Sequence, residues 1–208
     1  MRLEDKIKKW MFFFYALDVN RDGVLEPEDI DEIIDRLINT KPDLFTDSKA
    51  NYLRYIALKN FDRLLIEATK GKNRRINIQQ WINIIKKNNE IDKESYFIRW
   101  FSLSVVRFLF DLFDFNRDGF IDFDEFEALY KILGLNRANT IFAFKQMDVN
   151  KDGVLSKVEI YEAISNYFSA SNATINSYVF GQFRNLSQDY FNKLIAATRE
   201  EQKQLNHK

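Results

Sequence analysis

Apolar residues recur every three or four positions along several stretches of the chain, which is the spacing of one buried face of an α-helix. Three short polar segments, residues 18–29, 114–125 and 148–159, have such a stretch on both sides. The pattern therefore predicts three helix–loop–helix units. The flanking positions that we expect in the core are Trp10, Phe13, Phe14, Leu17, Ile30, Ile33, Ile34, Leu37, Val106, Leu109, Phe110, Phe113, Phe126, Leu129, Tyr130, Leu133, Thr140, Ala143, Phe144, Met147, Ile160, Ala163, Ile164 and Tyr167.

The three polar segments share one pattern, D-x-N-x-D-G, followed by an apolar residue at position 8 and an acid at position 12. Calcium takes about six to eight oxygen ligands, and side chains at positions 1, 3 and 5 of a tight turn can converge on one ion. Glycine at position 6 supplies the positive φ angle of this turn. The pattern is that of the EF-hand calcium loop, and its three copies make a chance surface turn an inadequate explanation.

We call these segments loop one, loop three and loop four. Their predicted ligands are the side chains at positions 1, 3, 5 and 12 and the backbone carbonyl at position 7. These ligands are Asp18, Asn20, Asp22, Val24 and Asp29 in loop one, Asp114, Asn116, Asp118, Phe120 and Glu125 in loop three, and Asp148, Asn150, Asp152, Val154 and Glu159 in loop four.

The three predicted sites are not equivalent. Asp29 is one methylene shorter than the Glu of the other loops, so it should offer one oxygen where Glu125 and Glu159 offer two, which favours magnesium relative to calcium. Loop three has an additional acid, Asp122, at position 9, where loop four has Ser156. We therefore expect three calcium sites, with the tightest binding in loop three and magnesium competition in loop one.

A fourth unit is expected between loops one and three, because EF-hands pair through short strands. Phe61, Leu64, Leu65 and Ala68 precede residues 69–80, and Trp81, Ile84 and Ile85 follow them. This segment, the silent loop, contains no carboxylate and has Arg74 in place of the glycine, together with Lys70, Lys72 and Arg75. Missing ligands and Coulomb repulsion should abolish cation binding there. We expect a structural partner whose Ile76 pairs with Leu25 in a two-stranded ribbon.

The predicted fold is all-α and compact, with four EF-hands in two pairs, the second hand being degenerate. Residues 1–91 hold loop one and the silent loop, and residues 92–168 hold loops three and four. The short polar linker between them favours pairs that pack together. Residues 169–208 form a C-terminal extension, in which Ser187 should cap a helix whose apolar stripe packs on the core.

Two long helices are expected outside the loop flanks. Asp47 or Ser48 should cap a helix that ends at Ala68, and a second, strongly apolar helix should run from Tyr96 to Phe113.

Composition excludes several classes of function. The chain of 208 residues has no Cys and one His, His207, so disulfides, thiolate sites and His-based catalytic or metal centres are not expected. Its 31 basic and 31 acidic residues give no reason to expect nucleic acid binding. No nucleophile with a base is visible, so we expect no enzyme. No apolar stretch reaches the roughly 20 residues of a membrane span, and the expected protein is a cytoplasmic monomer.

The arrangement of the hands resembles one particular group. A silent second hand, a long insertion before it, Asp29 at position 12 of the first loop and a hydrophobic tail are together similar to the sarcoplasmic calcium-binding protein and calexcitin group. Membership implies an intracellular calcium buffer or a calcium signalling protein. Only 3 Met accompany 20 Phe, whereas sensors that open around targets are commonly Met-rich, so a buffer or closed-form sensor is favoured.

Two alternatives remain open. Calcium-regulated photoproteins and luciferin-binding proteins share this layout, and an aromatic cavity would suffice for a luciferin or another lipophile, although the His residues and C-terminal Pro of the photoproteins are missing. The second alternative is a calcium-triggered regulator that exposes a surface to a protein or membrane partner. Loops one, three and four carry a net charge of −9 in an otherwise cationic chain, so filling them with divalent ions should favour acidic membrane surfaces.

Overall fold

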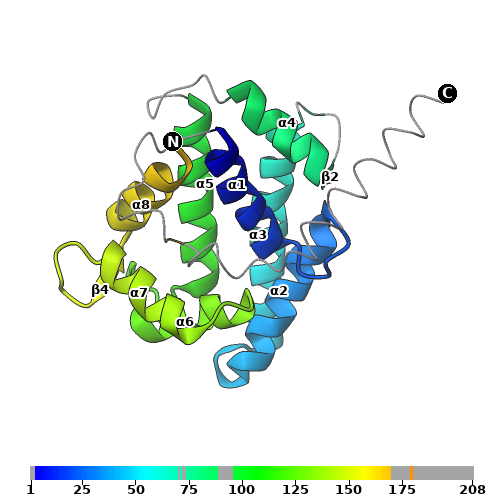
Figure 1. The fold of residues 1–208 in the computed structure, drawn as a ribbon. Coiled ribbons are helices and arrows are strands. Elements are labelled where there is room, and N and C mark those ends of the chain that lie inside the picture. Colours follow the sequence, from blue (N-terminus) through cyan, green and yellow to red (C-terminus); the bar gives the residue numbers. More distant parts are fainter. Residues whose placement is uncertain (1–2, 70, 72–73, 89–95, 170–178, 180–208) are drawn as a thin grey trace.

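The computed structural model describes residues 3–69, 71, 74–88, 96–169 and 179. In this part of the chain the structure is mostly helical, as predicted, with two short ribbons (Figure 1). The elements are α1 (Leu3–Leu17), β1 (Val24–Leu25), α2 (Pro27–Thr40), the 3-10 turn η1 (Pro42–Leu44), α3 (Asp47–Ala68), β2 (Ile76–Asn77), α4 (Ile78–Asn88), α5 (Tyr96–Phe113), β3 (Phe120–Asp122), α6 (Phe123–Ile132), α7 (Arg137–Met147), β4 (Val154–Ser156) and α8 (Lys157–Ser169).

The ribbons join the loops in the predicted pairs. β1 and β2 are antiparallel with Leu25 opposite Ile76, so the pairing predicted for loop one and the silent loop is confirmed. β3 and β4 are likewise antiparallel, with Ile121 opposite Leu155. All four of these side chains are buried, so each ribbon contributes one apolar pair to the core beneath its two loops.

The core forms around α1, which is buried on more than one face. Trp10, Phe13, Phe14 and Leu17 are buried as predicted, and Phe12 is buried as well. α4 packs on α1 within the N-terminal pair, and α8 packs on it from the C-terminal pair. The other predicted core positions whose side chains are described are buried too, except Ile84, which is partly buried.

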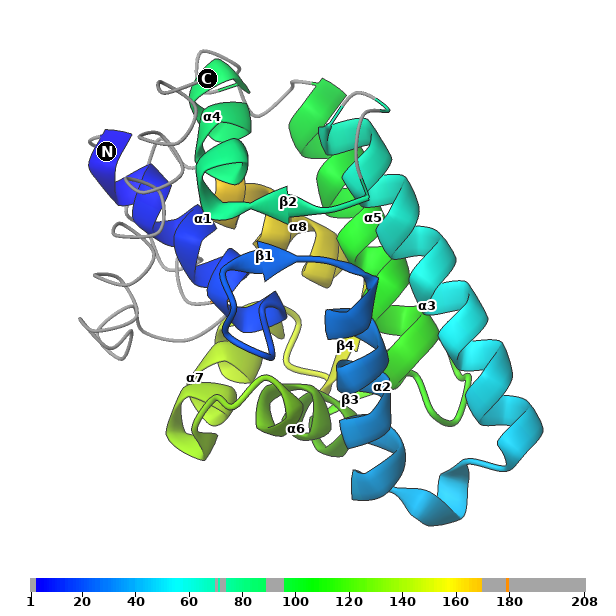
Figure 2. The same cartoon turned by 90° about the vertical axis from the view of Figure 1, so that its right-hand side faces the viewer.

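The two EF-hand pairs pack against each other. α2 contacts α6, α3 contacts α5, and α1 contacts α8, and Figure 2 shows α3 and α5 side by side along one edge of the molecule. The Arg36 Nη1 atom of α2 also donates a hydrogen bond to the carbonyl oxygen of Ile132 in α6, at 3.3 Å. The predicted boundary at residues 91 and 92 lies outside the described residues, so the domain limits stay a prediction.

Two expectations about helix ends have different outcomes. α3 begins at Asp47, and the amide of Lys49 donates to Thr46 Oγ1 at 3.3 Å. The side chain that caps α3 is therefore Thr46, and the prediction of Asp47 or Ser48 was wrong by one or two residues, because all three are good caps and sequence does not rank them. The expected helix from Tyr96 to Phe113 is confirmed.

The C-terminal extension lies outside the described residues except for Ser169 and Val179. Val179 is buried, and its carbonyl oxygen accepts a hydrogen bond from the buried Tyr130 hydroxyl. Packing of the predicted helix after Ser187 is therefore not described. No helix among the described residues has the length and hydropathy to cross a membrane.

Trp81 links α4 to α1, and its substitution should weaken the core. It is 2% exposed, its Nε1 donates to the Trp10 carbonyl at 3.0 Å, and its ring meets that of Trp10 edge-on. Trp81→Phe should lower the free energy of unfolding by about 1–3 kcal/mol, because it removes buried volume and a hydrogen bond. Urea unfolding in a chelator measures this, with Trp100→Phe, at a partly buried position, as the control. An equal loss of stability in both variants would contradict the role of Trp81 as the link between α4 and α1.

Candidate metal sites

Loops one, three and four follow the same backbone path. The residue at position 4 has a positive φ in each loop, 64° at Arg21, 58° at Arg117 and 60° at Lys151, and the glycine at position 6 has a φ of 85° or 86°. A side chain with a Cβ resists this conformation, and two such residues within three positions define a tight turn. The shared turn means that corresponding side chains of the three loops start from equivalent places.

The carboxylate at position 1 anchors this turn to the end of the entering helix. One oxygen of Asp18, Asp114 and Asp148 accepts the glycine N–H of its own loop, at 3.0, 3.1 and 3.2 Å. The second oxygen differs between loops, because Oδ1 of Asp18 accepts the Asp22 amide at 3.1 Å. Oδ1 of Asp114 and Oδ1 of Asp148 are buried without a hydrogen-bond partner.

A buried carboxylate oxygen without a donor is unfavourable, and a bound cation removes that cost. The donor set fits a hard cation such as calcium, since it consists of carboxylate, amide and carbonyl oxygens. By this criterion loops three and four are better suited to bind a cation than loop one, because Asp18 already has protein donors on both oxygens.

The side chain at position 12 closes each loop onto its own beginning. Asp29 accepts the amide of Val19 at 3.1 Å and that of Glu26 at 3.0 Å. Glu125 accepts the amides of Phe115 at 2.7 Å and Asp122 at 3.0 Å, and Glu159 makes the corresponding bonds. The position-12 group therefore fixes where the exiting helix begins relative to the entering one.

The amide and carboxylate at positions 3 and 5 are paired with each other. Asn116 donates to Asp118 Oδ2 at 2.8 Å, and Asn150 donates to Asp152 Oδ2 at 2.7 Å. The same pair in loop one, Asn20 and Asp22, is longer at 3.3 Å. Among the described residues no three acidic or histidine side chains form a group that could hold a metal ion.

Burial affects the position-12 carboxyls differently. Burial is the main cause that raises the pKa of Asp29 to about 6, and the nearby Asp18 carboxylate adds to it. Burial also raises the pKa of Glu125. At Glu159 burial acts in the same direction, but hydrogen bonds from Ser156, Asn150 and Val149 outweigh it and lower the pKa.

The silent loop keeps the architecture of a hand without its charge. Gln80, at position 12, accepts the amide of Asn77 at 3.0 Å, and Asn77 Oδ1 accepts the amide of Gln80 at 2.8 Å. These are the contacts that Asp122 and Glu125 make in loop three. The expected structural role of this hand is thus supported by a helix start that needs no carboxylate.

Two contacts of the silent loop were not predicted from the sequence. Arg74 pairs with Asp62 of α3, with Nε at 2.9 Å from Oδ1, and Arg75 Nε lies 2.6 Å from Glu26 Oε2 in loop one. The signal for the second contact was present, because the predicted pairing of Leu25 with Ile76 places Glu26 opposite Arg75 in an antiparallel ribbon.

The raised pKa of Asp29 predicts a pH dependence of the cation-free protein. Its value of about 6, against an ordinary value of 3.8, means that folding favours the protonated carboxyl. The stabilisation is full below the unfolded value and is lost as the pH rises through about 6, over a range of about 2–3 kcal/mol. Urea unfolding in a chelator should show a larger loss between pH 4 and 7 in the wild type than in Asp29→Asn, which keeps the raised pKa of Glu125.

Glu159→Gln is the control of opposite sign. Because the pKa of Glu159 is lowered, its contribution is present above the unfolded value and disappears as the pH falls. Parallel pH profiles for the wild type and Asp29→Asn would contradict the prediction.

Comparison with known proteins agrees with this geometry. A family model described as an EF-hand domain pair matches residues 7–131 and 103–165. The chain is 28% identical to calerythrin of Saccharopolyspora erythraea over 171 residues. This alignment covers 80% of this chain and 89% of calerythrin. In structure it is similar to the coelenterazine-binding protein of Renilla muelleri in its calcium-loaded apo form, with a TM-score of 0.68 at 20% identity over 86% of this chain and 97% of that one.

A sarcoplasmic calcium-binding protein from amphioxus has a TM-score of 0.64 at 19% identity, over 85% of this chain and 96% of that chain. At these identities the structural likeness shows the fold alone. The expected resemblance to the sarcoplasmic group is therefore confirmed for the fold. The match of the family model extends over most of the sequence. The chain therefore belongs to the family of EF-hand domain pairs, whose loops bind calcium.

Proposed function

We propose that the protein binds three calcium ions, in loops one, three and four, and acts as a cytoplasmic buffer or closed-form sensor. The fifteen ligands are those predicted above from positions 1, 3, 5, 7 and 12. The single observation that carries the proposal is the buried, unpartnered Oδ1 atom of Asp114 and of Asp148, because a cation at that point supplies the missing interaction. Loop one is included because it shares the sequence pattern and the turn of loops three and four. We also propose that the protein works as a monomer without catalytic activity, since the loop carboxylates serve the ions.

The packing of the two pairs supports a closed form. A sensor that captures target helices exposes an apolar groove when calcium binds. Here the apolar faces of α2 and α6, and those of α3 and α5, already meet across the two pairs. Opening either pair would separate surfaces that are now buried in one core, which opposes a large calcium-induced exposure.

Calorimetric titration tests the number of sites. We expect three calcium ions per chain, with loop three tightest at a dissociation constant of about 10⁻⁸–10⁻⁶ M. Glu125→Gln and Glu159→Gln should each reduce the stoichiometry by one, because each removes a charged ligand from one loop. Gln80→Glu in the silent loop is the matched control and should leave it at three, since that loop lacks the other ligands. A stoichiometry of two in the wild type would remove loop one from the proposal.

The cation preference of loop one should depend on the length of its position-12 side chain. Asp29→Glu should let the carboxylate reach the ion with two oxygens, which favours calcium over magnesium. Calcium titrations with and without millimolar magnesium should therefore show weaker magnesium competition at this site in the variant, by about fivefold or more. Unchanged competition would contradict the argument, and Glu125→Asp in loop three should change competition in the opposite direction.

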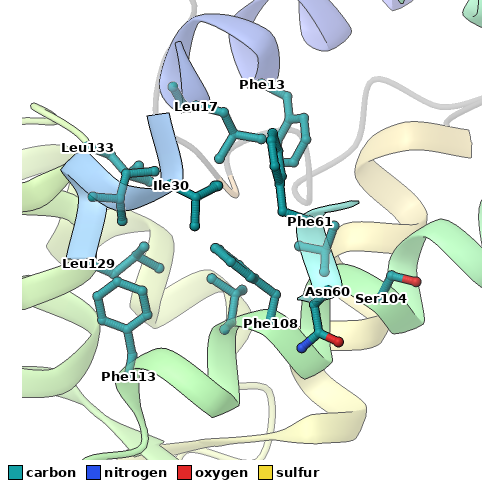
Figure 3. A pocket seen from close by; sticks show the side chains of 14 residues that line it. Phe13, Leu17, Ile30, Asn60, Phe61, Ser104, Phe108, Phe113, Leu129 and Leu133 are labelled. Carbon is teal, nitrogen blue, oxygen red and sulfur yellow. The ribbon is translucent and has the colours of Figure 1, made fainter. Parts of the chain in front are cut away.

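A lipophile-binding role is a second candidate, and one cavity favours it. Centres of water-sized spheres can occupy about 40 Å³ of it, within about 660 Å³ of empty space that includes open solvent, so a lipophile would enter only if lining side chains move. Figure 3 shows Phe13, Leu17, Ile30, Phe61 and further apolar side chains of both pairs around it. The structurally similar Renilla protein is named for binding coelenterazine, and we extend to this chain only the class of ligand, an apolar aromatic compound.

A hydrophobic fluorescent dye separates the candidates. For a buffer or closed-form sensor, calcium should not increase dye binding, whereas a calcium-triggered regulator with a protein or membrane partner should show a clear increase. If the cavity takes a lipophile, the dye should bind without calcium, and Val105→Phe should abolish this binding because Val105 lines the cavity. Val149→Phe is the matched control, since Val149 lies in loop four and is 77% exposed. Equal loss in both variants would contradict a cavity site.

A further inference from the structure

Loop one faces a positive charge across its ribbon. In the antiparallel pairing of β1 with β2, Leu25 lies opposite Ile76, so the next pair along the ribbon is Glu26 with Arg75. Arg75 Nε lies 2.6 Å from Glu26 Oε2. Glu26 occupies position 9 of loop one, and Arg75 occupies position 7 of the silent loop.

The corresponding pairs elsewhere in the two ribbons contain no cation. Position 9 of loop three, Asp122, lies opposite Val154, and position 9 of loop four, Ser156, lies opposite Phe120. Position 9 of the silent loop, Asn77, lies opposite Val24. An arginine opposite position 9 is therefore specific to loop one among the four ribbon positions of this kind.

Two of the other acids that loop one would use, Asp18 and Asp29, accept backbone amides. Asp18 accepts the amides of Asp22 and Gly23, and Asp29 accepts those of Val19 and Glu26. Glu26 differs, because its counter-ion is a guanidinium of the partner hand.

We propose that Arg75 is a specificity-determining residue that lowers the affinity of loop one for divalent cations. It neutralises the position-9 carboxylate of Glu26 and keeps a fixed positive charge beside the loop. The silent hand thereby sets the first site apart from loops three and four, in addition to pairing with it. This inference rests on the proposed binding of an ion in loop one.

Arg75 should affect the binding of an ion more than it affects folding. The Arg75 side chain is 65% exposed and that of Glu26 is 14% exposed, and ion pairs with an exposed partner contribute little to stability. A divalent ion doubles the Coulomb interaction of a monovalent one with the same fixed charge. Removing Arg75 should therefore change cation affinity while the unfolding of the cation-free protein stays nearly unchanged.

The test uses the full chain with Glu125→Gln and Glu159→Gln, so that loop one alone is titrated. In this background, Arg75→Gln should increase the calcium association constant at low salt by about fivefold or more. Arg74→Gln is the matched control, because it removes the same charge from the neighbouring residue, whose ion-pair partner is Asp62 and whose attraction to Glu28 of loop one is weaker. It should change the constant by less than about twofold. Arg75→Lys, which keeps the charge, should restore most of the original affinity.

Two further measurements separate this role from a structural one. The gain from Arg75→Gln should shrink at about 0.5 M salt because exposed charges are screened, and Glu26→Gln alone should lower the association constant, because it leaves the charge of Arg75 uncompensated. Equal gains from Arg74→Gln and Arg75→Gln, or a lower affinity in Arg75→Gln, would overturn the proposal.

The outcome for loop one itself is distinguishable. If one ion binds in the background protein with an affinity that Arg75→Gln leaves unchanged, the proposal about Arg75 fails and calcium binding in loop one stands. If neither protein binds an ion, the assignment of loop one fails, and the proposal about Arg75 fails with it.

Discussion

The closure of each loop by its own last side chain is the interaction on which the arrangement of the helices depends. Asp29, Glu125 and Glu159 each accept backbone N–H groups from the beginning of their loop and from the residue three positions before them. The exiting helix thus starts at a fixed place relative to the entering helix. Gln80 accepts the N–H of the residue three positions before it through a neutral amide. Position 12 can therefore fix the start of the exiting helix without also being a charged ligand.

The loops are joined to a core that both pairs build together. α1 is buried because α4 of its own pair and α8 of the other pair pack on it. α2 and α6, which leave loops one and three, also contact each other, and Arg36 donates to the carbonyl of Ile132 between them. A change in the direction of either exiting helix would therefore alter its contacts with the other. Because the core is shared, opening one pair would also disturb the other.

Much of this arrangement could be predicted from the sequence because it depends on local rules. The D-x-N-x-D-G pattern predicted the three loops, and helical spacing of apolar residues predicted both the hidden hand and the pairing of Leu25 with Ile76. The burial of Phe12 was not predicted, because Phe12 lies outside the apolar stripe of Trp10, Phe13, Phe14 and Leu17. The cap of α3 was misplaced because Thr46, Asp47 and Ser48 are chemically similar.

The silent loop shows how a correct pattern can lead to an incomplete interpretation. Its basic residues indicated only that it repels cations, an argument about the loop alone. In the structure two of these charges meet carboxylates outside it, Arg74 at Asp62 and Arg75 at Glu26. Charge in a paired hand acts across the ribbon as well as within the loop, because the strands bring positions 7 and 9 of opposite loops together. The charge environment of an EF-hand loop is therefore a property of the pair, because the twelve residues of loop one do not include the guanidinium of Arg75 that lies 2.6 Å from Glu26.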